Sequence, residues 1–192
     1  MSHTTIHIPT LETERLILRA PSRQDIQFYV AFKTSQRSAF TDGPHDPATA
    51  TALFSEVAGQ WIMRGYGLFM ATTKADPDTV VGGFGVFHPE GQEEPEFGWS
   101  LYAAEHEGKG YVTEAMRGVI PWAWTVLGVN TAQSHVHAGN DASVIVAERL
   151  GAAFDPEQTR IASAEGGQFY DPARPIDKPK VHIWRHTKGQ LK

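Results

Sequence analysis

The stretch from Glu96 to Glu114 carries the strongest chemical signal in this 192-residue chain. It reads EFGWSLYAAEHEGKGYVTE: a strand-like run, a loop with Gly108 and Gly110, and the start of a helix-like run. Glycine lets the backbone approach a ligand without a Cβ in the way. The first N–H groups of a helix lack internal partners, and with the helix dipole they favour an anion, usually phosphate. Lys109 adds positive charge. The segment predicts a phosphate-binding turn; the alternative is a strand-to-helix turn that holds nothing.

Other phosphate-binding motifs fit this segment less well. A P-loop needs GxxxxGK followed by Ser or Thr, and the chain has no such spacing. A dinucleotide fold needs a third glycine where Thr113 stands, and an acid at the end of the next strand, which ends near 135–137. A nucleotide-binding or unrelated α/β protein is therefore the weakest of the functional hypotheses.

Composition removes several classes of function. The chain has no cysteine, which excludes a disulfide scaffold, a thiolate zinc site and a cysteine nucleophile. With 17 basic and 22 acidic residues, the net charge is −5, so nucleic acid is not expected as the main partner. His135 and His137 would face the same side of a strand, but two partly buried, hydrogen-bonded imidazoles are expected there instead of a metal pair. No metal is expected.

The length of 192 residues suggests a single domain over 1–192, and two small domains are the alternative. No stretch approaches the roughly 20 apolar residues of a membrane span. The opening MSHTTIHIPT is polar and lacks the apolar core of a secretory signal. We therefore expect a cytoplasmic protein without membrane contact, with 1–10 as a flexible tail.

Apolar periodicity predicts the elements that position the glycine turn. Helical spacing favours helices over 25–33, 48–64, 110–127 and 141–150, the third with Pro121 inside it, where it should cause a kink. Alternation and β-branched residues favour strands over 16–20, 67–73, 79–88, 96–102, 131–137, 152–154 and 180–186. The order predicts a mixed α/β (α+β) sheet with antiparallel strands in the middle. Residues 155–179 should form a long loop that could cover an acceptor site. Phe28, Tyr29 and Phe32 are more typical of a core than of an acceptor pocket.

Four pieces of the sequence together resemble a known family. Glu105–Ala115, EHEGKGYVTEA, resembles the acyl-CoA signature of the GNAT N-acetyltransferase superfamily, and more closely the branch that includes the ribosomal-protein N-terminal acetyltransferases. Leu11–Arg19 is similar to that branch's start, and Glu96–Trp99 to its Glu-x-Gly-aromatic strand. Asn140–Ser143, followed by Glu148–Gly151, is similar to its Asn-x-x-Ser helix. The resemblance covers about 11–154.

The resemblance implies a fold and a cofactor site. The fold would be GNAT-like: a central, mostly antiparallel twisted sheet of about seven strands with four flanking helices, splayed between the fourth and fifth strands. The cosubstrate would be acetyl-CoA. Its pantetheine would pair with peptide groups around Ser100 and Leu101, and Asn140 and Ser143 would contact it from the next helix. Its pyrophosphate would bind the N–H groups of Gly108, Lys109, Gly110, Tyr111 and Val112. The family usually has Gln or Arg where this chain has Glu105, and an acid there could weaken affinity.

The resemblance also implies catalytic roles for two side chains. A protonated amine must lose a proton before it attacks a thioester, and Glu96 is the candidate general base. Ser143 is the candidate proton donor to the leaving thiolate. The alternative for Glu96 is a solvated strand carboxylate or a partner of an arginine, and for Ser143 an ordinary first-turn serine. Asn140 would cap its helix whether or not a cofactor binds.

The function favoured is an N-acetyltransferase that moves an acetyl group to a primary amine by direct transfer in a ternary complex. The acceptor could be a protein N-terminus or a small amine, and the acidic net charge mildly favours a cationic one. A homodimer is possible. The alternative is a non-catalytic acyl-CoA-binding or sensing module on the same fold.

Thermal unfolding with and without acetyl-CoA tests this interpretation. A ligand of the native state at 100 times its Kd adds about 2.7 kcal/mol, which should raise Tm by roughly 5–10 °C for a chain of this size. NAD at the same concentration is the control and should leave Tm unchanged. No shift at millimolar acetyl-CoA would remove the acyl-CoA site.

Overall fold

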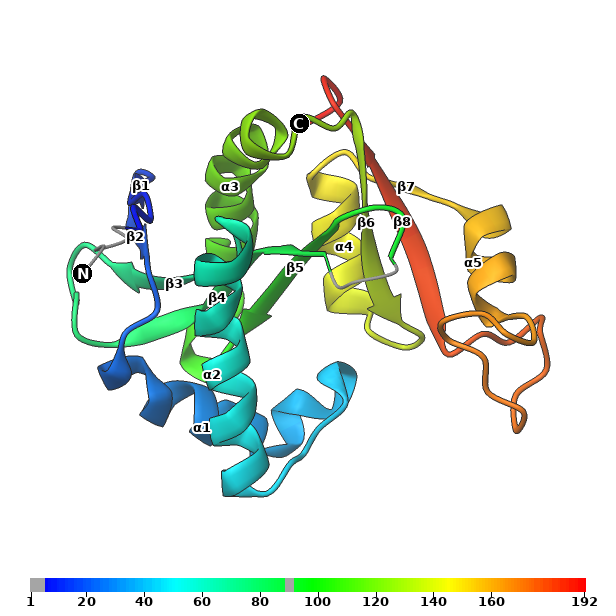
Figure 1. Ribbon diagram of the computed structural model, residues 1–192, viewed down its shortest axis with the longest axis horizontal. Helices are drawn as coiled ribbons and strands as arrows, with labels where there is room; N and C mark the ends of the chain where they lie inside the picture. Colours follow the sequence, from blue (N-terminus) through cyan, green and yellow to red (C-terminus); the bar gives the residue numbers. More distant parts are fainter. Residues whose placement is uncertain (1–5, 89–91) are drawn as a thin grey trace, which may run out of the picture. The chain divides into compact units, whose positions relative to one another are not determined.

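The computed structural model describes residues 6–88 and 92–192, and its contacts divide the chain into two compact units (Figure 1). The first unit comprises the chain up to Phe87 together with Gly98–Leu127. The second comprises His88–Phe97 and Gly128–Lys192. Strand β5, Glu96–Leu101, belongs to both, because the unit boundary falls between Phe97 and Gly98.

The first unit is a set of antiparallel strands with three α-helices. Its strands are β1 (Leu11–Glu12), β2 (Leu16–Arg19), β3 (Leu68–Thr73), β4 (Val80–Phe87) and the later part of β5, hydrogen-bonded in that order. Its helices are α1 (Ile26–Lys33), α2 (Pro47–Arg64) and α3 (Tyr111–Leu127), with short 3-10 helices η1 (Arg23–Asp25), η2 (Gln36–Thr41) and η3 (Ala104–His106). Helix α3 continues through Pro121 without a break.

Local sequence explains where α2 begins and ends. The Asp46 side chain accepts hydrogen bonds from the N–H groups of Ala48 and Thr49, and Pro47 occupies the first helical position, where its missing N–H costs nothing. Gly65 ends the helix with φ of 76°, a left-handed conformation that glycine adopts without strain. These signals place the helix within one residue of the expected 48–64.

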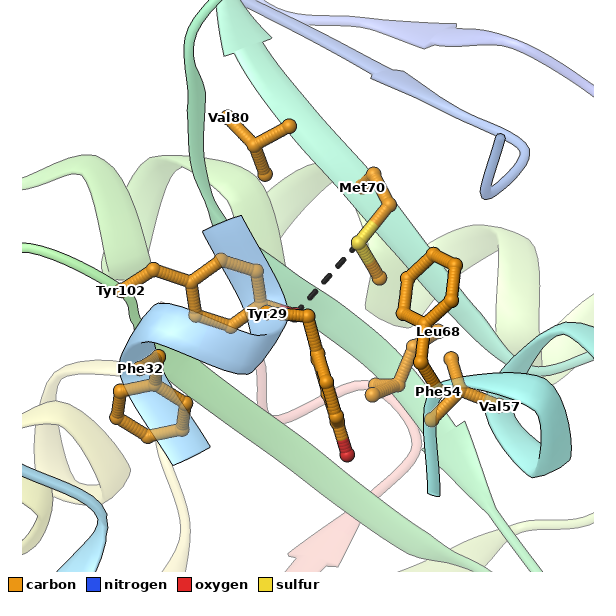
Figure 2. Close-up of a cluster of buried hydrophobic side chains, with 8 residues drawn as sticks. All are labelled: Tyr29, Phe32, Phe54, Val57, Leu68, Met70, Val80 and Tyr102. Carbon is orange, nitrogen blue, oxygen red and sulfur yellow. Dashed lines mark hydrogen bonds between the residues drawn. The ribbon is translucent and has the colours of Figure 1, made fainter. Parts of the chain in front are cut away.

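The core of the first unit is aromatic and lies between α1, α2 and the sheet. Eight buried residues make up the cluster drawn in Figure 2: Tyr29, Phe32, Phe54, Val57, Leu68, Met70, Val80 and Tyr102. The Tyr102 hydroxyl donates to Met70 Sδ at 3.5 Å, and burial raises the pKa of Tyr102 well above its ordinary value. Tyr29 and Phe32 are therefore core residues, as expected, and Phe28 packs against them from a partly buried position.

The second unit is built around one long antiparallel pair. Strand β6 (Thr131–His137) pairs with β8 (Val181–Thr187) along its whole length, and β7 (Ala153–Phe154) adds to the outer side of β8. Helices α4 (Asp141–Arg149) and α5 (Pro156–Ser163) complete it. Strand β6 also runs parallel to the start of β5, where the register joins Glu96 to Gln133.

The expected mixed α/β fold is confirmed, with two differences in detail. The described residues form a sheet of eight strands in the order β1-β2-β3-β4-β5-β6-β8-β7, against about seven expected, because Leu11–Glu12 forms a short strand beside β2. The described residues form five α-helices instead of four, since α5 lies inside the expected loop 155–179. Asp155 caps α5, and Pro156 opens it, which is a start signal that the glycine-rich sequence after it obscured.

The glycines of β4 generate a prediction about stability. A Cβ at Gly82 would collide with the backbone carbonyl of Ser100 on β5, whereas a Cβ at Gly59, inside α2, would meet nothing within 4 Å. Gly82→Ala should lower the free energy of unfolding by about 1–3 kcal/mol. Gly59→Ala is the matched control and should raise it by roughly 0.5–1 kcal/mol. Urea unfolding measures both, and equal effects of the two changes would contradict this packing of β4.

Candidate functional site

The glycine turn before α3 has the geometry of an anion site. Gly108 and Gly110 have φ of 69° and 78°, so a side chain at either position would be strained. The first bond that closes the helix runs from the Glu114 N–H to the Gly110 carbonyl at 3.1 Å. The N–H groups that precede it, from Gly108 to Thr113, therefore have no partner within the helix. Phosphate is the anion that a helix N-terminus of this kind usually binds.

A carboxylate in the first turn of α3 joins the turn to the start of the first unit. Glu114 Oε1 accepts from Thr13 Oγ1 at 2.6 Å and from the Arg15 N–H at 2.8 Å, and Oε2 accepts from Arg15 Nε at 2.7 Å. Burial acts to raise the pKa of Glu114, but these hydrogen bonds together hold the pKa below its ordinary value. These hydrogen bonds therefore join two of the sequence segments that resemble the family, Leu11–Arg19 and Glu105–Ala115.

Arg15 is a candidate ligand-binding residue that sequence reasoning missed. Its guanidinium lies 4.8 Å from the centre of the Tyr111 ring, and its Nη2 is the nearest atom to a Cβ built at Gly110, at 3.7 Å. Lys109 Nζ lies 6.0 Å from the same ring. The turn therefore carries two cations. The position of Arg15 within the family-like segment 11–19 could have indicated a role at the site. Its pairing with Glu114, 99 residues further along the chain, could not be inferred from the sequence.

Strand β5 pairs with β6 only where it begins. Among the described residues the register contains Glu96↔Gln133 and nothing further along β5, so the peptide groups of Ser100 and Leu101 have no partner on β6 in this register. The Leu101 carbonyl instead accepts from Arg37 Nη2 at 3.5 Å, and Arg37 also pairs with Glu107 at 2.7 Å. This limited pairing agrees with the expected splay between the fourth and fifth predicted strands.

Glu96 has a histidine as its partner, a pairing that the sequence reading did not predict. His135 Nδ1 lies 3.0 Å from Glu96 Oε2, and the two side chains are 8% and 22% exposed. His135 is thus one of the partly buried, hydrogen-bonded imidazoles expected on β6. Among the described residues, no group of three or more His, Cys, Asp or Glu side chains could hold a metal ion.

Asn140 and Ser143 form the start of α4. Asn140 Oδ1 accepts from the Ser143 N–H at 3.2 Å, so Asn140 is the helix N-cap, as predicted. The two residues belong to the second unit together with Glu96, whereas Ser100, Leu101 and the turn from Gly108 to Val112 belong to the first. Glu105 lies exposed in η3.

The comparisons with known proteins decide the family. Residues 15–153 match the family described as "Acetyltransferase (GNAT) domain". The chain belongs to the GNAT acetyltransferase family. An acetyltransferase from Agrobacterium tumefaciens str. C58 is 31% identical and has a TM-score of 0.77, with 98% of this chain and 99% of that chain covered. This GNAT protein is therefore an acyltransferase enzyme.

More distant structures share its fold. The spermidine N-acetyltransferase from Vibrio cholerae, in complex with CoA and spermine, has 17% identity and a TM-score of 0.68, covering 91% of this chain and 96% of that one. The ribosomal-protein-S5-alanine acetyltransferase from Vibrio fischeri has 13% identity and a TM-score of 0.68, covering 96% and 100%. A search of curated proteins found no match. Within the described residues, no helix is long and apolar enough to cross a membrane.

A buried histidine ties the start of β5 to β6 and β8 in this acetyltransferase. Ser134 Oγ donates to the Phe97 carbonyl at 2.7 Å and lies 2.9 Å from His186 Nε2. Because the Ser134 proton is engaged by that carbonyl, its oxygen accepts from Nε2–H, which fixes the neutral tautomer of His186. Burial lowers the pKa of His186 to about 4 from its ordinary value of 6.5.

This shift predicts a pH dependence of stability. The unfolded chain binds a proton at position 186 as the pH falls below about 6.5, but the folded chain does so only near pH 4. As the pH falls from about 6.5 to about 4, the free energy of unfolding should therefore decrease, by about 3 kcal/mol at most from this group. His186→Phe keeps the ring beside Phe97 and should flatten the fall between pH 7 and pH 4. Urea midpoints against pH measure it, and identical slopes in both proteins would contradict the assignment.

Proposed function

We propose that this acyltransferase moves an acetyl group from acetyl-CoA to a primary amine, by direct transfer in a ternary complex. The observation that carries the proposal is the turn at Gly108–Gly110, where two left-handed glycines precede a helix N-terminus whose first N–H groups have no partner within the helix, next to two cations. Membership of the GNAT family supports acetyl transfer in general.

The proposed cofactor contacts come from several elements. The N–H groups from Gly108 to Val112 would bind the pyrophosphate, and Arg15 and Lys109 would add positive charge beside it. The peptide groups around Ser100 and Leu101 would pair with pantetheine, which needs strand edges that no neighbouring strand occupies. Asn140 and Ser143 would contact the cofactor from the start of α4.

The proposed chemistry needs three groups of this chain. Bound acetyl-CoA supplies the acetyl group as a thioester. Glu96 would accept the proton that the ammonium must lose, which is worth typically about 10²–10⁴-fold in rate. A backbone N–H of β5 would donate to the thioester oxygen as it gains negative charge. Ser143 would protonate the departing thiolate. Holding amine and thioester together would supply much of the remaining acceleration.

The proposed acceptor is either a protein N-terminal amine or a small amine. The fold is shared with a spermidine N-acetyltransferase and with ribosomal-protein acetyltransferases, so both acceptor types occur on it. The net charge of −5 favours a cationic amine. The resemblance to the ribosomal-protein branch supports a place in that branch, a cytoplasmic location and a homodimer as parts of the same proposal.

Substitution of the two proposed catalytic side chains tests the mechanism. Thiol release from acetyl-CoA is followed with spermine and with a short peptide that has a free N-terminus. Glu96→Gln should lower kcat by roughly 10²–10⁴-fold, because an amide cannot accept the proton. Ser143→Ala should lower it as well, because the thiolate loses its proton donor. The Glu96→Gln variant should bind CoA as the wild type does, measured by calorimetry.

The control is Glu157→Gln on α5, an exposed carboxylate that pairs with Arg160 and should leave kcat unchanged. Wild-type rates in both site variants would refute the proposed roles. Failure of the wild type to acetylate any amine would refute the transfer itself, even if CoA binds.

A further inference from the structure

Glu96 lies at the end of a continuous chain of polar side chains within the second unit. Arg185 on β8 binds Glu94, Glu94 binds Gln133 on β6, Gln133 contacts His135, and His135 contacts Glu96. The distances between the contacting nitrogen and oxygen atoms in this series range from 2.6 to 3.2 Å. The charge on Glu94, at the other end of this series of side chains, sets the direction of each hydrogen bond between Glu94 and Glu96.

That far end is an ionised carboxylate. Glu94 accepts from Thr131 Oγ1 at 2.5 Å, and Arg185 Nη1 lies 2.7 and 2.6 Å from its two oxygens. Burial acts to raise the pKa of Glu94, but the hydrogen bonds from Thr131, Arg185 and Gln133 together lower the pKa below its ordinary value. Glu94 is therefore charged at neutral pH and can only accept hydrogen bonds.

The charge on Glu94 fixes the orientation of Gln133. Its amide nitrogen donates to Glu94 Oε2 at 2.7 Å, since the amide oxygen would be repelled there. The oxygen of Gln133 consequently faces His135 Nε2, at 3.2 Å. An amide oxygen only accepts, so His135 Nε2 must carry a proton. The ring of Phe169 packs edge-on against His135, with centroids 4.9 Å apart, and restricts its rotation.

The other ring nitrogen then has to share a proton with Glu96. With Nε2 protonated, a neutral imidazole presents a lone pair at Nδ1, and Glu96 Oε2 lies only 3.0 Å away. Two acceptors at that distance repel each other unless one proton lies between them. The side chains are largely withdrawn from water, at 8% and 22% exposure, so solvent does not relieve the repulsion fully.

We propose that His135 is a positioning residue for Glu96, held by Gln133 with Nε2 protonated, so that Nδ1 and the Glu96 carboxylate bind one proton between them. This inference rests on the proposed function and deepens it, because it makes the proton acceptor a carboxylate–imidazole pair instead of a lone carboxylate. His135 itself does not contact the reacting amine in this proposal.

The proton balance of the step follows from the pair. The shared proton leaves to solvent before catalysis, and the pair is then Glu96 carboxylate with neutral His135. One N–H bond of the ammonium breaks, its proton returns to the position between Oε2 and Nδ1, and the electron pair left on nitrogen forms the new N–C bond. The C–S bond breaks and its electrons stay on sulfur. Sulfur takes the hydroxyl proton of Ser143, and Ser143 takes the second proton that the nitrogen releases. Among the described residues, the charged groups connected to the pair through Gln133 are Glu94 and Arg185, with Asp155 bound to Arg185, and His137 follows two residues along β6.

The first experiment reads the protonation state without activity. Nitrogen-15 NMR of the histidine rings should show His135 Nε2 as an N–H nitrogen from acid to alkaline pH, with Nδ1 changing only when the shared proton is lost. His186, with its fixed Nε2–H, serves as the reference in the same spectrum. Gln133→Leu should release Nε2 and give a mixture of tautomers. An unprotonated His135 Nε2 in the wild type at neutral pH would overturn the proposal.

The second experiment separates positioning from mere structural support. His135→Asn keeps a side-chain N–H near the Nδ1 position but cannot bind an extra proton. It should retain CoA binding and the KM for the amine, lower kcat by roughly 10–100-fold, and move the acidic limb of the kcat–pH profile to lower pH. That loss is smaller than the roughly 10²–10⁴-fold expected when the base itself is lost.

His182→Asn on β8 is the matched control and should change neither kcat nor the profile. An active wild type whose His135→Asn variant keeps the same kcat and profile would overturn the role of His135 while leaving the proposed function intact. A wild type that acetylates no amine would overturn the proposed function, and the NMR result would still decide whether the pair shares a proton.

Discussion

The ionised carboxylate of Glu94 is the constraint on which the second unit depends. It accepts from Thr131, Gln133 and Arg185, which come from both strands of the long β6–β8 pair. Arg185 also binds Asp155, whose other oxygen caps α5. This partly buried carboxylate therefore connects the start of α5, through Arg185 and Asp155, with the polar groups of the β6–β8 pair.

A second carboxylate, that of Glu114, connects separate segments of the first unit. Glu114 lies in the first turn of α3, where the helix dipole favours a negative charge, and it binds Thr13 and Arg15 from the start of the sheet. The glycine turn immediately precedes that turn of the helix. A helix end that is held by three hydrogen bonds to another segment keeps its free N–H groups in one arrangement. Such preorganisation is what an anion site needs, because a flexible turn would lose entropy on binding.

Strand β5 has to satisfy different demands at its two ends. At Glu96 and Phe97 it is fixed by the Gln133 register, by Ser134 and by the ring of His186. Further along, the register that the described residues show with β6 does not continue, and Arg37 donates to the Leu101 carbonyl. A strand that is held by β4 along one side can offer the backbone groups of its other side to a ligand without losing its place in the sheet. The peptide groups proposed to bind pantetheine lie in this later part of β5.

The sequence by itself determined the element types, the glycine turn and the family. Capping residues, β-branched runs and left-handed glycines act within a few residues, and the Asn140 cap was predicted from such a local signal. In the structure, Asp46 and Gly65 end α2 through contacts of the same local kind. Two short elements, β1 and α5, were not predicted. Strand β1 has only two residues, which is too few for an alternating pattern, and the start signal of α5 was obscured by the glycine-rich sequence after it.

Only the tertiary structure decided the partners of charged side chains. Glu114 with Arg15, Glu94 with Arg185 and Glu96 with His135 are each separated by dozens of residues along the chain. A carboxylate's partner is set by which strands become neighbours, and the sequence of one chain does not state that pairing. The sequence could therefore name Glu96 as a candidate base, but its histidine partner follows from the parallel register of β5 and β6.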